Sequence, residues 1–271
     1  MKWSLVRRYC GIFALACQDV LQARSIELVW LSLSILNTAT LLLFWIAGFA
    51  NGSVASKTSL PQIEFYYILL IITGQALMSH VEESVSRIDI KEGGLVKHLL
   101  HPISYFWFQF WTEIPWRIGG FTMSMIGLFI LITCFDLHFN LPLPTALTIL
   151  PISLILVLAI LLSFTYKMVL SLSTFWILEG WALFEFMDIA VIFLAGYLMP
   201  LTFFPDWVQK IAFALPFAYM IYVPVQAIMG HLDLTQLLMG IGMQLLWLCI
   251  FGFLYKILWR RGLALFTGVG Q

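Results

Sequence analysis

The longest polar stretch of the sequence covers residues 80–101. Its charged and imidazole side chains are His80, Glu82, Glu83, Arg87, Asp89, Lys91, Glu92, Lys97, His98 and His101. Apolar residues recur between them at helical spacing, Gly93 and Gly94 permit a turn, and Pro102 ends the stretch. We expect one or two short amphipathic helices in residues 82–102. Such a helix can dock in a groove on a soluble partner; the alternative is a solvated loop without a partner.

Three carboxylates lie in or just before the fifth long apolar run. Glu185 and Asp188 are three positions apart and share one face of a helix, and Glu179 precedes them. Carboxylates within a membrane can relay protons, which would suit an ion-coupled secondary transporter. Glu185 and Asp188 lie close to the expected cytoplasmic end of their helix, so snorkelling or pairing with a neighbouring helix is the favoured interpretation.

The sequence lacks the common signatures of catalytic and nucleotide-binding sites. It contains no GxxxxGK[ST] phosphate loop, GxGxxG turn, HExxH helix or GxSxG elbow. The four cysteines form no CxxC pair, and the histidines lack carboxylates at metal-ligand spacing. We therefore expect no catalytic residues, no metal site and no cofactor bound by this chain.

The composition places these residues in a membrane protein. Of 271 residues, 62% are hydrophobic and 10% are charged, and the mean hydropathy is +0.97. Soluble domains have about 45–50% apolar and about 25% charged residues. No stretch is polar enough for a soluble nucleotide-binding domain, so any energy source must lie on another chain. The 14 basic and 14 acidic residues balance, which gives no reason to expect nucleic acid as a partner.

Six apolar runs are long enough to span a bilayer as helices. They cover about residues 27–49, 63–81, 114–135, 146–170, 181–201 and 234–258. An even number of spans places both termini on one side. Basic residues gather in the connections and at the span ends on that side: Lys2, Arg7, Arg8, Arg24, Arg87, Lys91, Lys97, Lys167, Lys256, Arg260 and Arg261. Because cytoplasmic loops are enriched in Lys and Arg, we expect both termini in the cytoplasm.

Two further segments are apolar without being regular spans. Residues 1–25 interleave apolar and charged side chains, as in an amphipathic helix that lies in the headgroup region. Residues 203–229 contain Pro205, Trp207, Pro216 and Pro224. Proline interrupts helices, and irregular backbone at membrane depth must be covered by protein or water. We expect a re-entrant helical hairpin before the sixth span.

Three stretches together resemble a known family. The first is residues 89–102, DIKEGGLVKHLLHP. The second comprises residues 173–176, Gly196, Pro200, residues 204–207, 215–217 and 222–224, and Gly230; the third is residues 259–263 with Gly268 and Gly270. Their order and spacing are similar to those of the ABC-2 type permeases, the six-span membrane subunits of bacterial ABC exporters. The whole chain is then one all-α permease domain, residues 1–271.

The resemblance implies a role for each segment. In such permeases the segment between spans two and three docks on an ATPase; here it contributes Asp89, Ile90, Glu92, Gly93, Leu95, Lys97, Leu99, Leu100 and Pro102. Two permeases, identical or paralogous, form the pathway, and two separate ATPase subunits bind ATP and magnesium. The resemblance also implies a bacterial plasma membrane, contact with its lipids, and export of an amphipathic drug, antibiotic, lipid or glycan.

The docking hypothesis has a specific form for this chain. Nucleotide on a partner can shift the membrane part only through contacts that differ between two states. We expect Ile90, Leu95, Leu99 and Leu100 to supply apolar contacts and Glu92 and Lys97 to orient the segment. The leading alternative function is a secondary transporter that uses Glu185 and Asp188, and a membrane-embedded enzyme or structural subunit ranks last.

Overall fold

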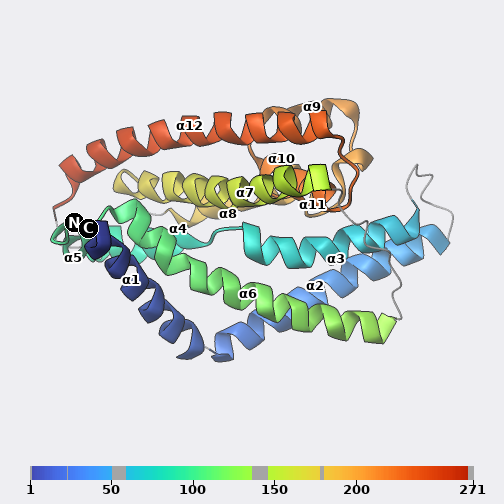
Figure 1. The fold of residues 1–271 in the computed structure, drawn as a ribbon, viewed down its shortest axis with the longest axis horizontal. Helices are drawn as coiled ribbons and strands as arrows, with labels where there is room; N and C mark the ends of the chain where they lie inside the picture. Colours follow the sequence, from blue (N-terminus) through green and yellow to red (C-terminus); the bar gives the residue numbers. More distant parts are fainter. Residues whose placement is uncertain (1, 23, 51–58, 136–145, 178–179, 268–271) are drawn as a thin grey trace.

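The structure is a computed structural model that describes the chain except residues 1, 23, 51–58, 136–145, 178–179 and 268–271 (Figure 1). The described residues form helices and the turns between them, without strands. The elements are α1 (Lys2–Gln22), α2 (Arg24–Ala50), α3 (Leu60–Leu77), α4 (Val81–Ser84), the π-helix η1 (Val85–Lys91), α5 (Leu95–Leu99), α6 (Tyr105–Phe135), α7 (Ala146–Leu172), the 3-10 turn η2 (Ser173–Phe175), α8 (Trp181–Leu194), the 3-10 turn η3 (Leu201–Phe203), α9 (Asp206–Ala214), α10 (Phe217–Met220), α11 (Tyr222–Ile228) and α12 (Leu234–Leu265).

The long helices run roughly lengthwise, and the short ones gather at the two ends (Figure 1). Helix α12 packs along α7, while α6 contacts α1, α2 and α3. The start of α1, the end of α12 and α5 lie at one end of the molecule, and α9 lies at the other (Figure 1). The 82–102 segment and the predicted hairpin are therefore at opposite ends of the bundle.

Each of the six predicted spans contains a helix, but not every boundary is as expected. Three helical stretches in the described part are long and apolar enough to cross a membrane: Leu60–Lys91, Leu147–Phe175 and Leu234–Leu265. The count of six spans and the direction of the termini remain predictions. The fifth run was expected to be helical through residue 201, and that boundary is wrong. Helix α8 has 14 residues and ends at Leu194.

Helix α8 ends early because the chain reverses at Gly196. This glycine has a φ of +82°, in the left-handed region, and a Cβ there would lie 2.7 Å from the Tyr66 hydroxyl. Carbonyl groups in this turn accept hydrogen bonds from tyrosine side chains of α3. Tyr66 Oη donates to the Gly196 carbonyl at 2.7 Å, and Tyr67 Oη donates to the Leu198 carbonyl at 2.7 Å.

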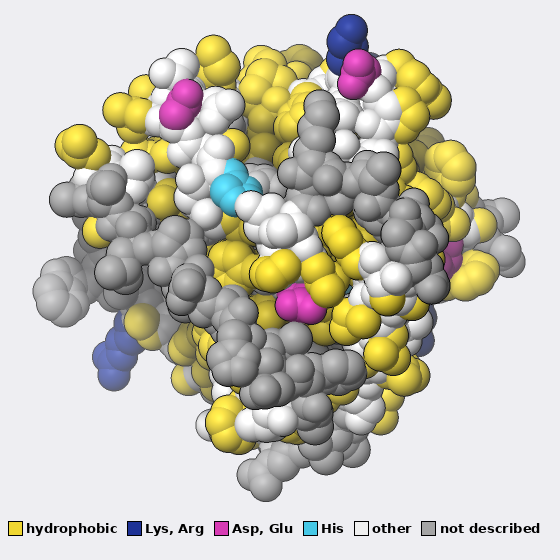
Figure 2. Space-filling model, turned by 90° about the vertical axis from the view of Figure 1, so that its right-hand side faces the viewer, with side chains coloured by type: hydrophobic (Ala, Val, Ile, Leu, Met, Phe, Trp, Pro, Cys, Tyr) yellow, Lys and Arg dark blue, Asp and Glu magenta, His cyan; other side chains and the backbone are white. Residues whose placement is uncertain are grey.

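The prolines separate short helices in residues 203–229, as the sequence predicts. Pro205 and Pro216 immediately precede α9 and α10, and Pro224 lies in the first turn of α11, where a missing N–H costs no helical hydrogen bond. Helices α10 and α11 are buried almost throughout, whereas Trp207 on α9 is 66% exposed. On this end of the molecule, hydrophobic side chains predominate among the described residues, with few charges between them (Figure 2).

The N-terminal helix forms as expected and packs on the bundle. Helix α1 lies along α6, where the rings of Tyr9 and Phe13 lie 6.3 and 6.5 Å from that of Trp111. Its position relative to the headgroup region remains a prediction.

The turn at Gly196 gives a test of the fold. We expect Gly196→Ala to lower the free energy of unfolding by about 1–3 kcal/mol, because alanine is strained at a positive φ and its methyl group displaces the Tyr66 hydroxyl. Gly242→Ala is the matched control, since no atom lies within 4 Å of a Cβ there. Thermal unfolding of the detergent-purified protein measures both. Equal melting temperatures for the two variants would contradict this account.

Candidate functional site

The 82–102 segment forms three short pieces at the end of the bundle that holds the start of α1 and the end of α12 (Figure 1). Helix α4 continues into η1, and a turn at Gly93 and Gly94 leads into α5. Gly93 has a φ of +77°. A Cβ on Gly94 would lie 2.7 Å from the Ile88 carbonyl oxygen. The two glycines therefore allow η1 and α5 to pack closely against each other.

The apolar residues of this segment divide between a buried and an exposed side. Ile90 and Leu95 are 2% and 0% exposed and belong to a cluster with Phe164, Met168 and Leu172 of α7. The prediction that Ile90 and Leu95 contact a partner is therefore not supported, because helical geometry turns them into the protein. The exposed apolar side chains are Ile88, Val96, Leu99 and Leu100, which are 45%, 40%, 47% and 79% exposed.

Asp89 faces inward and fixes the segment to α6. Its carboxylate accepts hydrogen bonds from Tyr105 Oη at 2.5 Å and Gln109 Nε2 at 2.6 Å, and His98 Nε2 lies 3.5 Å away. Burial and the adjacent carboxylate raise the pKa of the Tyr105 hydroxyl well above its ordinary value, so Tyr105 stays a donor. The Tyr105 ring stacks on Trp259 of α12 at 4.9 Å. Asp89 thus acts within the protein and not on its surface.

A second anchor holds the break between α3 and α4. Helix α3 ends at Leu77 and leaves carbonyl groups without helical partners. Arg117 donates to the carbonyls of Ala76 and Leu77 at 3.1 and 2.9 Å, and Ser163 of α7 also donates to Leu77. Glu113, paired with Arg117 at 3.2 Å, accepts from the His80 N–H at 3.0 Å. An ion pair on α6 therefore clamps the point where the segment leaves α3.

The third anchor is a buried lysine. Lys167 Nζ lies 2.7 Å from Glu82 Oε1 and 2.6 Å from Asp188 Oδ1, and its side chain is 1% exposed. The sequence places Lys167 at the end of the fourth apolar run, among the basic residues of the expected cytoplasmic side; in the structure it lies within α7 and is buried. Its ammonium group joins α4, α7 and α8, and charges taken out of water are stable only when paired in this way.

The three carboxylates singled out in the sequence differ in their positions and partners. Asp188 pairs with a neighbouring helix, which was the favoured interpretation. Glu185 is exposed and has no part in this ion-pair group, and Glu179 lies outside the described residues. Glu82 and Lys167 are the participants that the sequence analysis missed. The available signal was an ionisable side chain inside an apolar run, which by default marks a paired or functional site.

The exposed residues Glu92, Lys97 and Pro102 flank the exposed leucines, so the segment presents an apolar patch with charges beside it. Across the described residues, no three His, Cys, Asp or Glu side chains are placed to hold a metal ion. The arrangement can bind a partner surface and transmit its displacement to α3, α6, α7 and α8.

Comparison with known proteins identifies the protein family. A family model described as ABC-2 family transporter protein matches residues 35–270. The chain belongs to the ABC-2 transporter family. The match includes the 82–102 segment, all three anchors and helices α9–α11. No curated protein and no solved structure matches the chain. ABC-2 permeases are membrane subunits for transport, not catalytic subunits, and their family membership implies partnership with an ABC ATPase.

The Lys167 anchor of this ABC-2 permease can be tested by stability. Lys167→Met leaves two carboxylates without their cation, and we expect it to cost about 3 kcal/mol of unfolding free energy. Adding Asp188→Asn removes one of the unpaired charges. The loss of unfolding free energy in the double variant should therefore be smaller than the sum of the losses in the two single variants, by about 1 kcal/mol or more. Lys256→Met, at an exposed lysine of α12, is the control. Additive losses in thermal unfolding would exclude the ion-pair group as a unit.

Proposed function

We propose that this ABC-2 permease is the membrane subunit of an ATP-driven exporter in a bacterial plasma membrane. It pairs with a second permease, identical or paralogous, and with two separate ATPase subunits that bind ATP and magnesium. The cargo is an amphipathic drug, antibiotic, lipid or glycan, and both termini of the permease lie in the cytoplasm. The observation that carries this proposal is the exposed apolar patch on a segment that is otherwise anchored inside the protein.

The docking patch comprises Ile88, Val96, Leu99 and Leu100. Each of these side chains is at least 40% exposed, although the same segment buries Ile90 and Leu95 completely or nearly so. Apolar side chains grouped at the tip of a short helix and rimmed by charges are typical of a helix that enters a groove on another protein. Glu92 and Lys97 lie beside the patch and supply opposite charges that orient the docked ATPase.

The three anchors explain how docking would move the permease. An ATPase that closes on nucleotide can pull or push only what is rigidly attached to it. Asp89 ties the docked segment to α6, the Glu113–Arg117 pair ties its start to α3 and α6, and Lys167 ties it to α7 and α8. Displacement of the segment therefore shifts four long helices together, which supports a pathway that opens and closes with the ATPase cycle.

Substitutions in the docking patch should weaken ATPase binding without lowering the stability of the permease. Leu99→Ser combined with Leu100→Ser removes apolar area that the ATPase would bury, so we expect about tenfold or greater weakening of co-purification with the ATPase. Stability should change little because both side chains are exposed. Leu234→Ser at the opposite end is the matched control, since Leu234 is 46% exposed against 47% for Leu99. Undiminished co-purification of the double variant would remove the docking role.

The ATP-driven exporter and the ion-coupled transporter predict opposite results for a substitution of Glu185. If the permease works by ATP, Glu185→Gln should leave ATPase stimulation and ATP-dependent transport in the assembled complex unchanged, because this carboxylate is exposed and takes no part in the three anchors. If Glu185 carries a coupling proton, the same variant should transport poorly, and transport should persist without the ATPase. Reconstitution in liposomes with and without the ATPase separates the two.

A further inference from the structure

A pocket lies at the opposite end of the molecule from the docking patch. Its volume is about 340 Å³, and α3, η3, α9 and α11 form its walls together with the loop before α12. This volume is at the lower end of the range of ligand pockets, about 300–1,000 Å³, which suits a small ligand. The pocket lies beside the turn that follows α8, where Tyr66 of α3 donates to the Gly196 carbonyl.

The walls are mostly apolar and largely immobile. Ile63 and Tyr66 of α3 are 0% and 1% exposed, and Val223 and Met229 are each 6% exposed. These side chains are therefore fixed by packing behind the pocket. In membrane transporters, helices interrupted within the bundle form cavities that hold ligands, and this pocket lies beside such an interruption.

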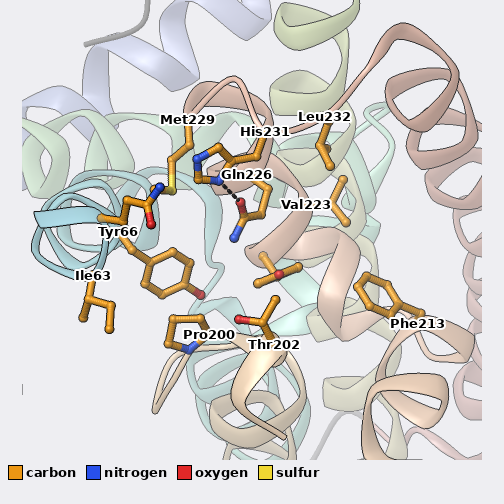
Figure 3. Close-up of a pocket in the computed structure, with 12 residues that line it drawn as sticks. Ile63, Tyr66, Pro200, Thr202, Phe213, Val223, Gln226, Met229, His231 and Leu232 are labelled. Carbon is orange, nitrogen blue, oxygen red and sulfur yellow. Dashed lines mark hydrogen bonds between the residues drawn. The ribbon is translucent and has the colours of Figure 1, made fainter. Parts of the chain in front are cut away.

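A few polar groups converge on the same space. Figure 3 shows the hydroxyls of Tyr66 and Thr202 and the amide of Gln226 pointing into it. Gln226 Oε1 lies 2.8 Å from His231 Nδ1, so the imidazole fixes the amide and leaves the Gln226 NH2 group as a donor. Tyr66 Oη already donates to the Gly196 carbonyl and is left as an acceptor. Between its apolar walls the pocket thus offers the Gln226 amide as a donor and Tyr66 Oη as an acceptor, and the side chains of Thr202, Tyr222 and Gln62 also line it.

Among the described residues, those that line the pocket include no Lys, Arg, Asp or Glu, and the one imidazole, that of His231, is bonded to Gln226. A charged ligand would lose its hydration without gaining a counter-ion, which is costly. We propose that this pocket is a binding site for a small uncharged ring compound that carries a hydroxyl or carbonyl oxygen. Its ring lies against the apolar walls, its oxygen accepts from Gln226, and its hydroxyl donates to Tyr66. Binding here is inferred from the pocket alone and does not depend on the proposed export.

Photolabelling tests this site on the full chain in lipid nanodiscs without an ATPase. The probe is 4-(hydroxymethyl)benzophenone, which is uncharged, carries both oxygen functions and inserts into nearby C–H bonds on irradiation. We expect saturable adducts on the pocket-lining residues, Met229 above all, mapped by mass spectrometry. The carboxylate analogue 4-benzoylbenzoate should compete poorly. Labelling that does not saturate, or equal competition by the carboxylate, would overturn the proposal.

Two variants make the assignment specific. Thr202→Trp fills the pocket from an exposed position and should lower Met229 labelling by about tenfold, since a whole ring loses its apolar contacts. Thr122→Trp, at an exposed threonine of α6, should label like the unchanged protein. Gln226→Leu keeps the shape and removes the donor, so it should weaken labelling without abolishing it. Undiminished Met229 labelling in both Thr202→Trp and Gln226→Leu would exclude this site.

Discussion

Backbone groups that leave a helix inside an apolar bundle must find new hydrogen-bond partners, and this constraint governs both ends of the permease. At the end of α3, Arg117 and Ser163 bind the freed carbonyls. After α8, the hydroxyls of Tyr66 and Tyr67 do the same. Each break would otherwise cost several kcal/mol, since buried polar groups without partners are unstable. The 82–102 segment follows the first break, and the pocket lies beside the second.

The buried charged groups must likewise find partners inside the bundle. An ion pair buried in protein contributes little net stability compared with a well-packed apolar group, but loss of one partner is severely destabilising. Lys167, Glu82 and Asp188 are therefore best understood as a means of fixing relative positions. The ammonium group bonds carboxylates from both α4 and α8, and α4 lies at the start of the 82–102 segment. Specificity of position is what a mechanical link between an ATPase and a transport pathway requires.

The sequence was sufficient for the features that local chemistry determines. Gly93 and Gly94 marked the turn in the 82–102 segment, and Pro205 and Pro216 marked the short helices before α12, because glycine frees the backbone and proline restricts it wherever they occur. The sequence was insufficient where a residue distant in the chain determines a helix end or the burial of a side chain. The end of α8 depends on Tyr66, some 130 positions away. Burial of Ile90 and Leu95 depends on α7, and basic residue counting could not distinguish Lys167 in a buried pair from a loop lysine.

The two ends of the molecule share their structural elements, which suggests how one could influence the other. Helix α3 carries Tyr66 at the pocket and is clamped by Arg117 at the coupling end. Helix α7 carries Lys167, and its Ile155 carbonyl is joined to that of Tyr219 in α10 through the side-chain amide of Gln244, which donates to both at 3.1 and 3.0 Å. A shift of α3 must move one wall of the pocket, and a shift of α7 must move Tyr219 of α10 with it or break these buried hydrogen bonds. Because breaking them is costly in an apolar interior, rigid displacement is the cheaper response.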